Sequence, residues 1–175
     1  RISPPALDGT NTEAYFAYRK PIDVPDNFYK ALLDALDPQD VDWIALHGYS
    51  RGSQDDPAND AKFGNDPLLW QYFGFRMWEP FAKILREKGP DWERLTIVIT
   101  ETNHLKVGGA WNANNHNGWD DNSDGANWIR KAYAYVQKWN QQDNDQYVHG
   151  LVLYRLSQDE WKIENKPGLL GALRE

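Results

Sequence analysis

The sequence predicts a parallel α/β fold, in which buried strands alternate with amphipathic helices. Three nearly continuous apolar runs, at 41–47, 95–100 and 148–154, are typical of parallel strands that are covered on both faces. A fourth run, at 2–6, contains two prolines and can supply only the end of a strand. Because a helical pattern follows each run, the predicted order is β-α-β-α-β-α-β-α, which favours one parallel sheet.

Capping residues and apolar spacing predict the first two helices. Asp26 can cap a helix over 27–36, and its apolar face is Phe28, Leu32, Leu33 and Leu36. Asp66 and Pro67 open a second helix that Gly89-Pro90 ends. Pro80 inside it predicts a kink or a break into two helices. The inward side chains of this stretch are Leu69, Phe73, Met77, Phe81 and Leu85.

Two more helices are predicted towards the end of the chain. Ser123 or Asp124 begins the third, whose inward residues are Ile129, Ala132, Val136 and Trp139. Lys166-Pro167 opens a short final helix over 168–173. The strands then end at Ala6, His47, Glu101 and Arg155. Ligands of parallel sheets sit at the carboxyl ends of the strands, so we expect the functional site there.

Length and composition restrict the function classes. The 175 residues fit a single domain over 1–175, without a linker or an internal repeat. Absence of cysteine excludes disulfide scaffolds, thiolate metal sites and cysteine nucleophiles. A net charge of -7 argues against a nucleic-acid partner, and no apolar run is long enough for a transmembrane helix.

Aromatic residues are unusually frequent, with 9 Trp, 9 Tyr and 6 Phe. One interpretation is a core of large residues, since each aromatic side chain buries about 150–250 Å². The other is a carbohydrate site, in which flat indole rings stack on pyranose rings. Composition leaves both open, and the positions of the aromatic residues have to decide.

The best candidate for chemistry is Glu101, directly after the strongest predicted strand. A carboxylate at the tip of a buried strand is held rigidly where loops converge, as a nucleophile requires. His47 and Tyr49 end the preceding strand, and neighbouring parallel strands lie about 4.8 Å apart. We expect Tyr154 and Arg155 to point to opposite faces at the end of the last strand, with Arg155 near Glu101. A helix cap, a structural histidine and an ordinary surface salt bridge are the structural alternatives.

The loop that follows Glu101 is long and polar, and loops of this length are usually functional or disordered. It places Trp111 and Trp119 among asparagines, a setting that suits sugar platforms, with buried tryptophans as the alternative. Asp120, Asn122 and Asp124 match the first half of a calcium loop, but Lys131 occupies the position where its last glutamate belongs. A turn before a helix explains these acids equally well.

Other catalytic signatures are absent from the sequence. It contains no G-x-G-x-x-G, no Walker A and no H-E-x-x-H motif, so we predict no cofactor and no metal. The serine in Gly48-Tyr49-Ser50-Arg51-Gly52 lacks the preceding glycine of a nucleophile elbow, which argues against a serine hydrolase.

The motifs at the strand ends resemble the second half of a cellulase-like retaining glycoside hydrolase (β/α)8 barrel. Thr100-Glu101-Thr102-Asn103 resembles the strand-seven motif that carries the nucleophile. His47-Gly48-Tyr49 is similar to a motif at the tip of strand six, and Tyr154 takes the place of an aromatic residue at strand eight. The resemblance implies a (βα)4 half of a TIM barrel, with strand five at 2–6.

The same resemblance implies that the general acid/base glutamate, at the tip of strand four, would precede Arg1. Asp8 and Glu13 in the first loop are weak substitutes. Retaining hydrolysis needs two carboxyl groups about 5–5.5 Å apart. Four strands do not close an eight-stranded barrel, so we expect pairing with a second half-barrel or self-association.

The leading hypothesis is therefore a glycosidase domain that carries the nucleophile Glu101 and is inactive as an isolated chain. The resemblance implies carbohydrate as the partner, and a secreted or extracellular location if the substrate is a polysaccharide. The candidate substrate-binding residues are His47, Tyr49, Asn103, His104, Trp111, Trp119, Tyr154 and Arg155. The alternatives are a non-catalytic carbohydrate-binding domain and an open α/β domain that binds another small ligand.

Overall fold

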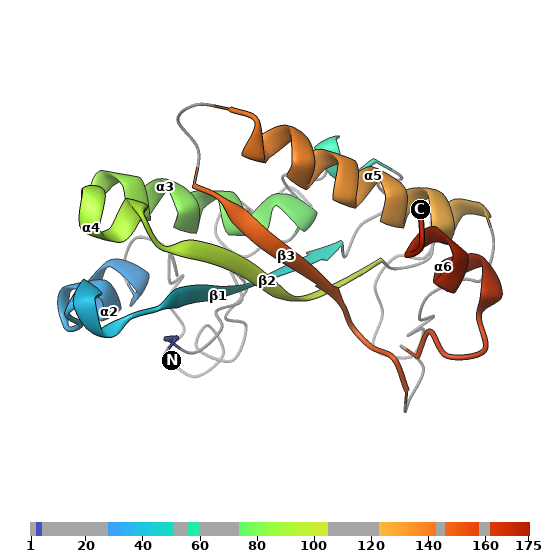
Figure 1. Cartoon of the computed structure of the whole chain (residues 1–175), viewed down its shortest axis with the longest axis horizontal. Coiled ribbons are helices and arrows are strands. Elements are labelled where there is room, and N and C mark those ends of the chain that lie inside the picture. Colours follow the sequence, from blue (N-terminus) through green and yellow to red (C-terminus); the bar gives the residue numbers. More distant parts are fainter. Residues whose placement is uncertain are drawn as a thin grey trace, which may run out of the picture.

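The computed structural model describes seven parts of the chain: residues 3–4, 28–50, 56–59, 74–104, 123–142, 146–157 and 162–175. They form a mixed α/β structure around a parallel sheet of three strands in the order β1-β2-β3 (Figure 1). The strands are β1 (Trp43–Ser50), β2 (Thr96–His104) and β3 (Val148–Leu153). The three apolar runs predicted as parallel strands are therefore confirmed.

The fourth predicted strand, at 2–6, lies mostly outside the described residues. Ser3 and Pro4, which are described, belong to no strand. Proline is confined to the edges and first positions of strands, because its nitrogen has no hydrogen to donate to a neighbour.

The described helices overlap those that capping and spacing predict, while the predicted cap at Asp26 and the first part of the second predicted helix, 66–73, lie outside the described residues. They are α2 (Lys30–Asp34), α3 (Glu79–Glu87), α4 (Pro90–Glu93), α5 (Ser123–Asn140) and α6 (Pro167–Ala172). The described residues also include the short 3₁₀ helices η2 (Pro38–Asp40), η3 (Pro57–Asn59) and η4 (Phe75–Trp78).

The predicted interruption near Pro80 is confirmed. The 3₁₀ helix η4 ends at Trp78 and α3 begins at the next residue, so that Pro80 falls in the first turn of α3. A missing N–H is harmless there, because the first turn of a helix has no carbonyl to bond it. Gly89, with a φ of 102°, separates α3 from the additional turn α4, which the sequence analysis did not predict.

The apolar face predicted for the first helix is wrong at one position. Phe28 is 50% exposed, whereas Tyr29 is buried. Tyr29 and Leu33 are four residues apart and Leu32 and Leu36 flank them, so these four side chains form one helical stripe. Tyr29 also packs its ring edge-on against Phe81 of α3, with the ring centroids 5.0 Å apart.

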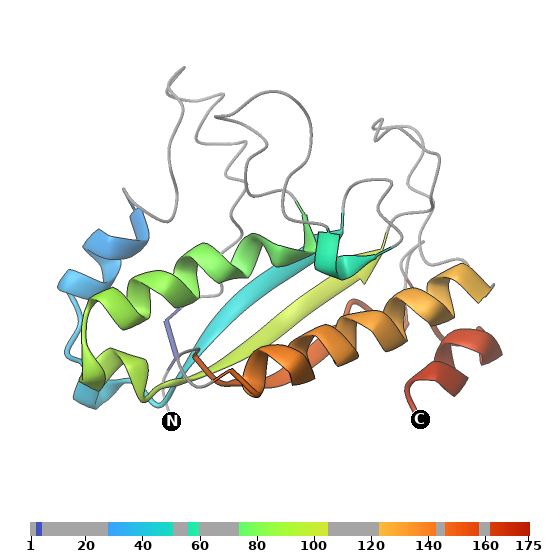
Figure 2. The same ribbon diagram turned by 90° about the horizontal axis from the view of Figure 1, so that it is seen from above.

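Helices α3 and α5 cover one face of the sheet (Figures 1 and 2). Their apolar side chains and those of the strands form one core, which includes the predicted inward residues Phe81, Leu85, Ile129 and Val136. Gly48 identifies the covered face of β1, because a Cβ there would meet Trp78 and the carbonyl oxygen of Phe75. Side chains alternate along a strand, so His47 and Tyr49 point to the opposite face.

A network of charged groups ties η4 and α3 to α5. Arg76 binds both carboxylate oxygens of Glu79, at 2.6 and 2.7 Å, and the Tyr135 hydroxyl donates to the same carboxylate. The hydrogen bond from Arg76 to Glu79 raises the pKa of the guanidinium. Burial, followed by the hydrogen bond to Glu79, raises the pKa of the Tyr135 phenol. These contacts hold η4 and α3 against α5.

Within the described parts of the chain, no helix is long and apolar enough to cross a bilayer.

Candidate functional site

The candidate site lies on the last four residues of β1 and β2, because both strands continue three residues beyond the predicted ends at His47 and Glu101. Strand register pairs His47 with Glu101 and Tyr49 with Asn103, and it shifts by one residue between Leu46 and His47. The shift moves the pairing partner of His47 from Thr100 to Glu101. The four side chains therefore come from alternate positions on two neighbouring strands, and the predicted proximity of His47 and Glu101 is confirmed.

The Glu101 carboxylate is held by two side chains of β1. The Tyr49 hydroxyl donates a hydrogen bond to Oε2, and His47 Nε2 lies 3.9 Å from Oε1. The His47 and Tyr49 rings meet edge to face, with 5.3 Å between their centroids. About a third of the Glu101 side chain (34%) stays exposed, against 17% for His47. A carboxylate fixed by these contacts and still open to solvent can reach a ligand.

Tyr49 also contacts η4 through its backbone. Its backbone N–H donates to the sulfur of Met77, 3.4 Å away, inside the core. Apolar spacing predicts that Met77 lies on an inward helical face, and Met77 is buried, but this spacing carries no signal for the sulfur contact. Gly48 allows the close approach of η4, as the three atoms within 3.3 Å of a hypothetical Cβ show. The position of Tyr49 thus depends on η4.

Two residues beyond Glu101, Asn103 is 6% exposed, and its Oδ1 is buried without a hydrogen-bond partner. Thr102, between them, points to the covered face and donates its hydroxyl to the Gly48 carbonyl. This bond ties the ends of β1 and β2 together. The side chain of His104, the next predicted binding residue, lies outside the described residues.

Tyr154 and Arg155 do not follow the predicted arrangement. Strand β3 ends at Leu153, so strict alternation between the faces no longer governs the next two residues. The Arg155 guanidinium lies 4.8 Å from the centroid of the Tyr154 ring, and both side chains are therefore on the same side. Among the described residues, the contacts to the Glu101 carboxylate come from β1 and not from Arg155. Tyr154 stays near the site through its N–H, which donates to the Thr102 carbonyl at 2.7 Å.

The loop with Trp111 and Trp119 lies outside the described residues, as do Asp120 and Asn122 of the partial calcium motif, so these predictions are untested. Asp124 of the same motif lies in the first turn of α5. Asp8 and Glu13 also lie outside the described residues. In the described ranges, no group of three or more His, Asp or Glu side chains is placed to hold a metal ion.

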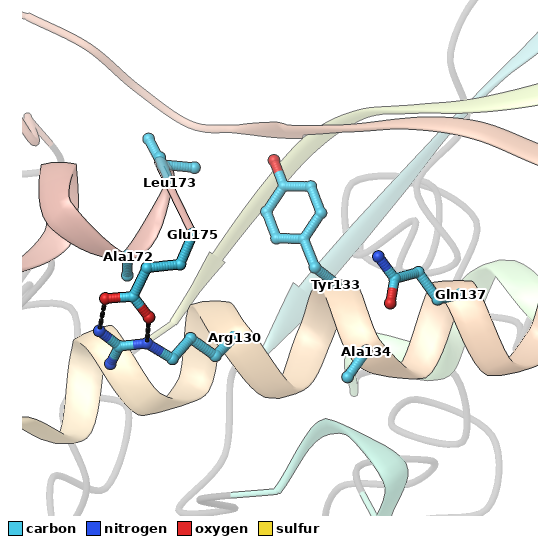
Figure 3. Close-up of a pocket in the computed structure, with 7 residues that line it drawn as sticks. All are labelled: Arg130, Tyr133, Ala134, Gln137, Ala172, Leu173 and Glu175. Carbon is cyan, nitrogen blue, oxygen red and sulfur yellow. Dashed lines mark hydrogen bonds and ion pairs between the residues drawn. The ribbon is translucent and has the colours of Figure 1, made fainter.

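A separate recess of about 390 Å³ lies between α5 and the end of the chain, away from Glu101 (Figure 3). Arg130 and Glu175 form a two-pronged ion pair at one end, at 2.5 and 2.7 Å. The Tyr133 hydroxyl donates to the Leu151 carbonyl at 2.7 Å. Because Arg130, Glu175 and Tyr133 already bond to groups of the chain, they are poorly placed to bond a ligand in this recess.

No known protein family matches this chain, and no curated protein matches it either.

Proposed function

We propose that this chain carries the nucleophile of a retaining O-glycosidase that acts on oligosaccharides or polysaccharides, with Glu101 in that role. One observation supports the proposal most strongly. Glu101 lies three residues before the last residue of β2, accepts a hydrogen bond from Tyr49, lies 3.9 Å from His47, and is still one-third exposed. A nucleophile has to be rigid and accessible at the same time, and an ordinary helix cap or surface salt bridge needs neither property.

In the proposed reaction, one Glu101 oxygen attacks the anomeric carbon of the sugar and displaces the leaving group. A glycosyl ester forms, and water then hydrolyses it with overall retention of configuration. The hydrogen bond from Tyr49 to Oε2 leaves Oε1 as the oxygen that attacks. Tyr49 is more deeply buried than Glu101, which favours the carboxylate over the phenol as the nucleophile.

A second carboxyl group has to protonate the leaving oxygen and later activate the water. Among the described residues, the groups that contact Glu101 are a phenol and an imidazole. We therefore propose that the acid/base is supplied from outside the described residues, and that Trp111, Trp119 and Tyr154 stack against the sugar.

The finer fold that accompanies this function is half of a (β/α)8 barrel. Three parallel strands in sequential order, each followed by a helix, support it. In a half-barrel the outer edges of β1 and β3 would pair with another half, and Val152 on β3, which is 50% exposed, would be covered. Sedimentation over a range of concentrations tests this pairing. A strictly monomeric chain would contradict self-association.

Labelling of Glu101 by an activated fluorosugar tests the nucleophile. The chain is incubated with 2,4-dinitrophenyl 2-deoxy-2-fluoro-β-glycosides of glucose, mannose and xylose. Dinitrophenolate departs without being protonated, so the reaction does not depend on the acid/base. Fluorine at C2 slows hydrolysis of the ester, which therefore accumulates. We expect the intact mass to rise by one fluoroglycosyl group, with the modified peptide containing Glu101.

Two variants control this experiment. Glu101→Gln removes the nucleophile and should abolish labelling. Glu93→Gln changes an exposed carboxylate on α4, at the other end of the sheet, and should label as the wild type does. Labelling at another residue, or no labelling by any of the sugars in a folded wild-type chain, would contradict the proposal.

A non-catalytic carbohydrate-binding domain is the second candidate. The absence of a second carboxylic acid among the described contacts of Glu101 favours it. Saturable binding of an oligosaccharide together with no labelling of Glu101 would establish this function in place of the first.

A further inference from the structure

Among the described residues, Ser50 and Asn103 near the ends of the strands have buried polar atoms without a hydrogen-bond partner. Ser50, the last residue of β1, is fully buried, and its Oγ bonds to nothing. Asn103, near the end of β2, is 6% exposed, and its Oδ1 likewise has no partner. Most buried polar atoms in proteins are paired, because an unpaired one loses its bonds to water without replacement. Each exception therefore needs a reason.

The two residues lie on opposite faces of the sheet. Tyr49 points to the face of Glu101, so its neighbour Ser50 points to the face that α3 and α5 cover. Asn103 follows Glu101 by two residues and shares its face, roughly 6.6 Å further along the strand. It is also the register partner of Tyr49, the residue that holds the carboxylate. Asn103 thus borders the reactive group, whereas Ser50 does not.

We propose that the Asn103 carboxamide binds a hydroxyl group of a neutral saccharide at this site and selects ligands that carry this hydroxyl. The inference rests on the proposed function and adds the chemical group that is recognised. A carboxamide has an acceptor and two donors, and a hydroxyl can donate and accept, so the two groups are complementary. A half-turn about χ2 exchanges Oδ1 with Nδ2, which lets the side chain present either atom.

The charge of the site supports a neutral ligand. Glu101 lies on the same face, and among the described residues its one basic contact is the imidazole of His47; the whole chain has a net charge of -7. An anionic group beside Asn103 would be repelled. A site that is built to bond a hydroxyl discriminates strongly against an analogue without it, because the buried polar group is then left unpaired.

The direct test follows the Asn103 side chain by NMR. The full chain, labelled with ¹⁵N-asparagine, is titrated with β-1,4-linked tetrasaccharides of glucose, mannose and xylose. The signal of the Asn103 side-chain NH₂ group is assigned by its loss in Asn103→Ala. We expect one tetrasaccharide to shift this signal saturably. If none of the three moves it, the inference is wrong.

Matched variants measure the contribution of the carboxamide. Asn103→Ala should weaken binding of that tetrasaccharide about tenfold. Ser50→Ala also removes an unpaired buried group, but from the other face, and should bind within twofold of the wild type while melting at or above its temperature. If Asn103→Ala fails to fold, Asn103→Ser replaces it. Unchanged affinity in the Asn103 variants would overturn the inference.

The outcomes separate this inference from the proposed function. Fluorosugar labelling of Glu101 with an unmoved Asn103 signal would leave the nucleophile in place and refute the role of Asn103. A saturable Asn103 shift without any labelling would support hydroxyl recognition and refute the nucleophile.

Discussion

Replacement of Gly48 by alanine tests whether η4 holds the site in place. Gly48 lies between His47 and Tyr49, on the face of β1 that packs against η4. A Cβ added there would lie 3.1 Å from the Phe75 carbonyl oxygen, 3.2 Å from Trp78 Cδ1 and 3.3 Å from Ile99 Cγ2. A methyl group would therefore force the strand and η4 apart.

The expected loss follows from how these neighbours can respond. The closest atom belongs to the backbone, and the Trp78 and Ile99 side chains are completely buried, so none of the three can turn away into solvent. Forcing one extra methyl group into a packed core usually costs about 1–3 kcal/mol. Alanine regains about 0.5–1 kcal/mol by reducing the freedom of the unfolded chain. We expect a net loss of about 1–2 kcal/mol, which lowers Tm by about 2–8 °C in a protein of this size.

Urea denaturation followed by tryptophan fluorescence measures this change, with two glycines as controls. A Cβ at Gly150 would meet Val98 Cγ1 at an ordinary 3.7 Å, and one at Gly171, in α6, would meet nothing within 4 Å. Gly150→Ala should be close to neutral, and Gly171→Ala should stabilise the chain by about 0.5–1 kcal/mol. Gly48→Ala should also slow fluorosugar labelling of Glu101. Stability of Gly48→Ala equal to that of Gly171→Ala would refute the packing argument.

Two further variants test the core and the charged network. Burial raises the pKa of the Tyr29 phenol above its ordinary value of 10.0, so the stability contributed by its protonated form is complete below pH 10 and is lost as the pH rises towards the raised pKa. The buried Tyr29 hydroxyl has no hydrogen-bond partner among the described residues, so Tyr29→Phe should raise the free energy of unfolding at pH 7 by about 1 kcal/mol. Between pH 7 and pH 10.5 this free energy, measured by urea titration, should fall less in the variant than in the wild type. A variant that is less stable than the wild type at pH 7 would contradict this. Glu79→Ala leaves Arg76 and the Tyr135 hydroxyl without their carboxylate, so it should lower the free energy of unfolding by about 2–3 kcal/mol, as measured by thermal unfolding. Equal Tm values for Glu79→Ala and the wild type would show that the network does not stabilise the fold.

The positions of the strands and of most helices could be read from the sequence, because burial on both faces leaves a continuous apolar run and a covered helix leaves a spaced one. The same reasoning put Glu101 and His47 on neighbouring strands, and the register pairs them, although both strands continue three residues beyond the predicted ends. Both are consequences of local pattern. The error at Phe28 marks the limit of that pattern, since two adjacent aromatic residues fit the spacing and the edge contact of Tyr29 with Phe81 selects one of them.

The details of the site were decided by the tertiary structure. The one-residue register shift after Leu46 sets His47 opposite Glu101, and the end of β3 at Leu153 brings Tyr154 and Arg155 to one side. The Met77 sulfur contact with Tyr49 joins residues 28 positions apart. Local sequence thus determined which residues reach the end of the sheet. Which atoms make contact there depends on how separate elements pack against one another. The spacing of apolar residues along the sequence does not report that packing.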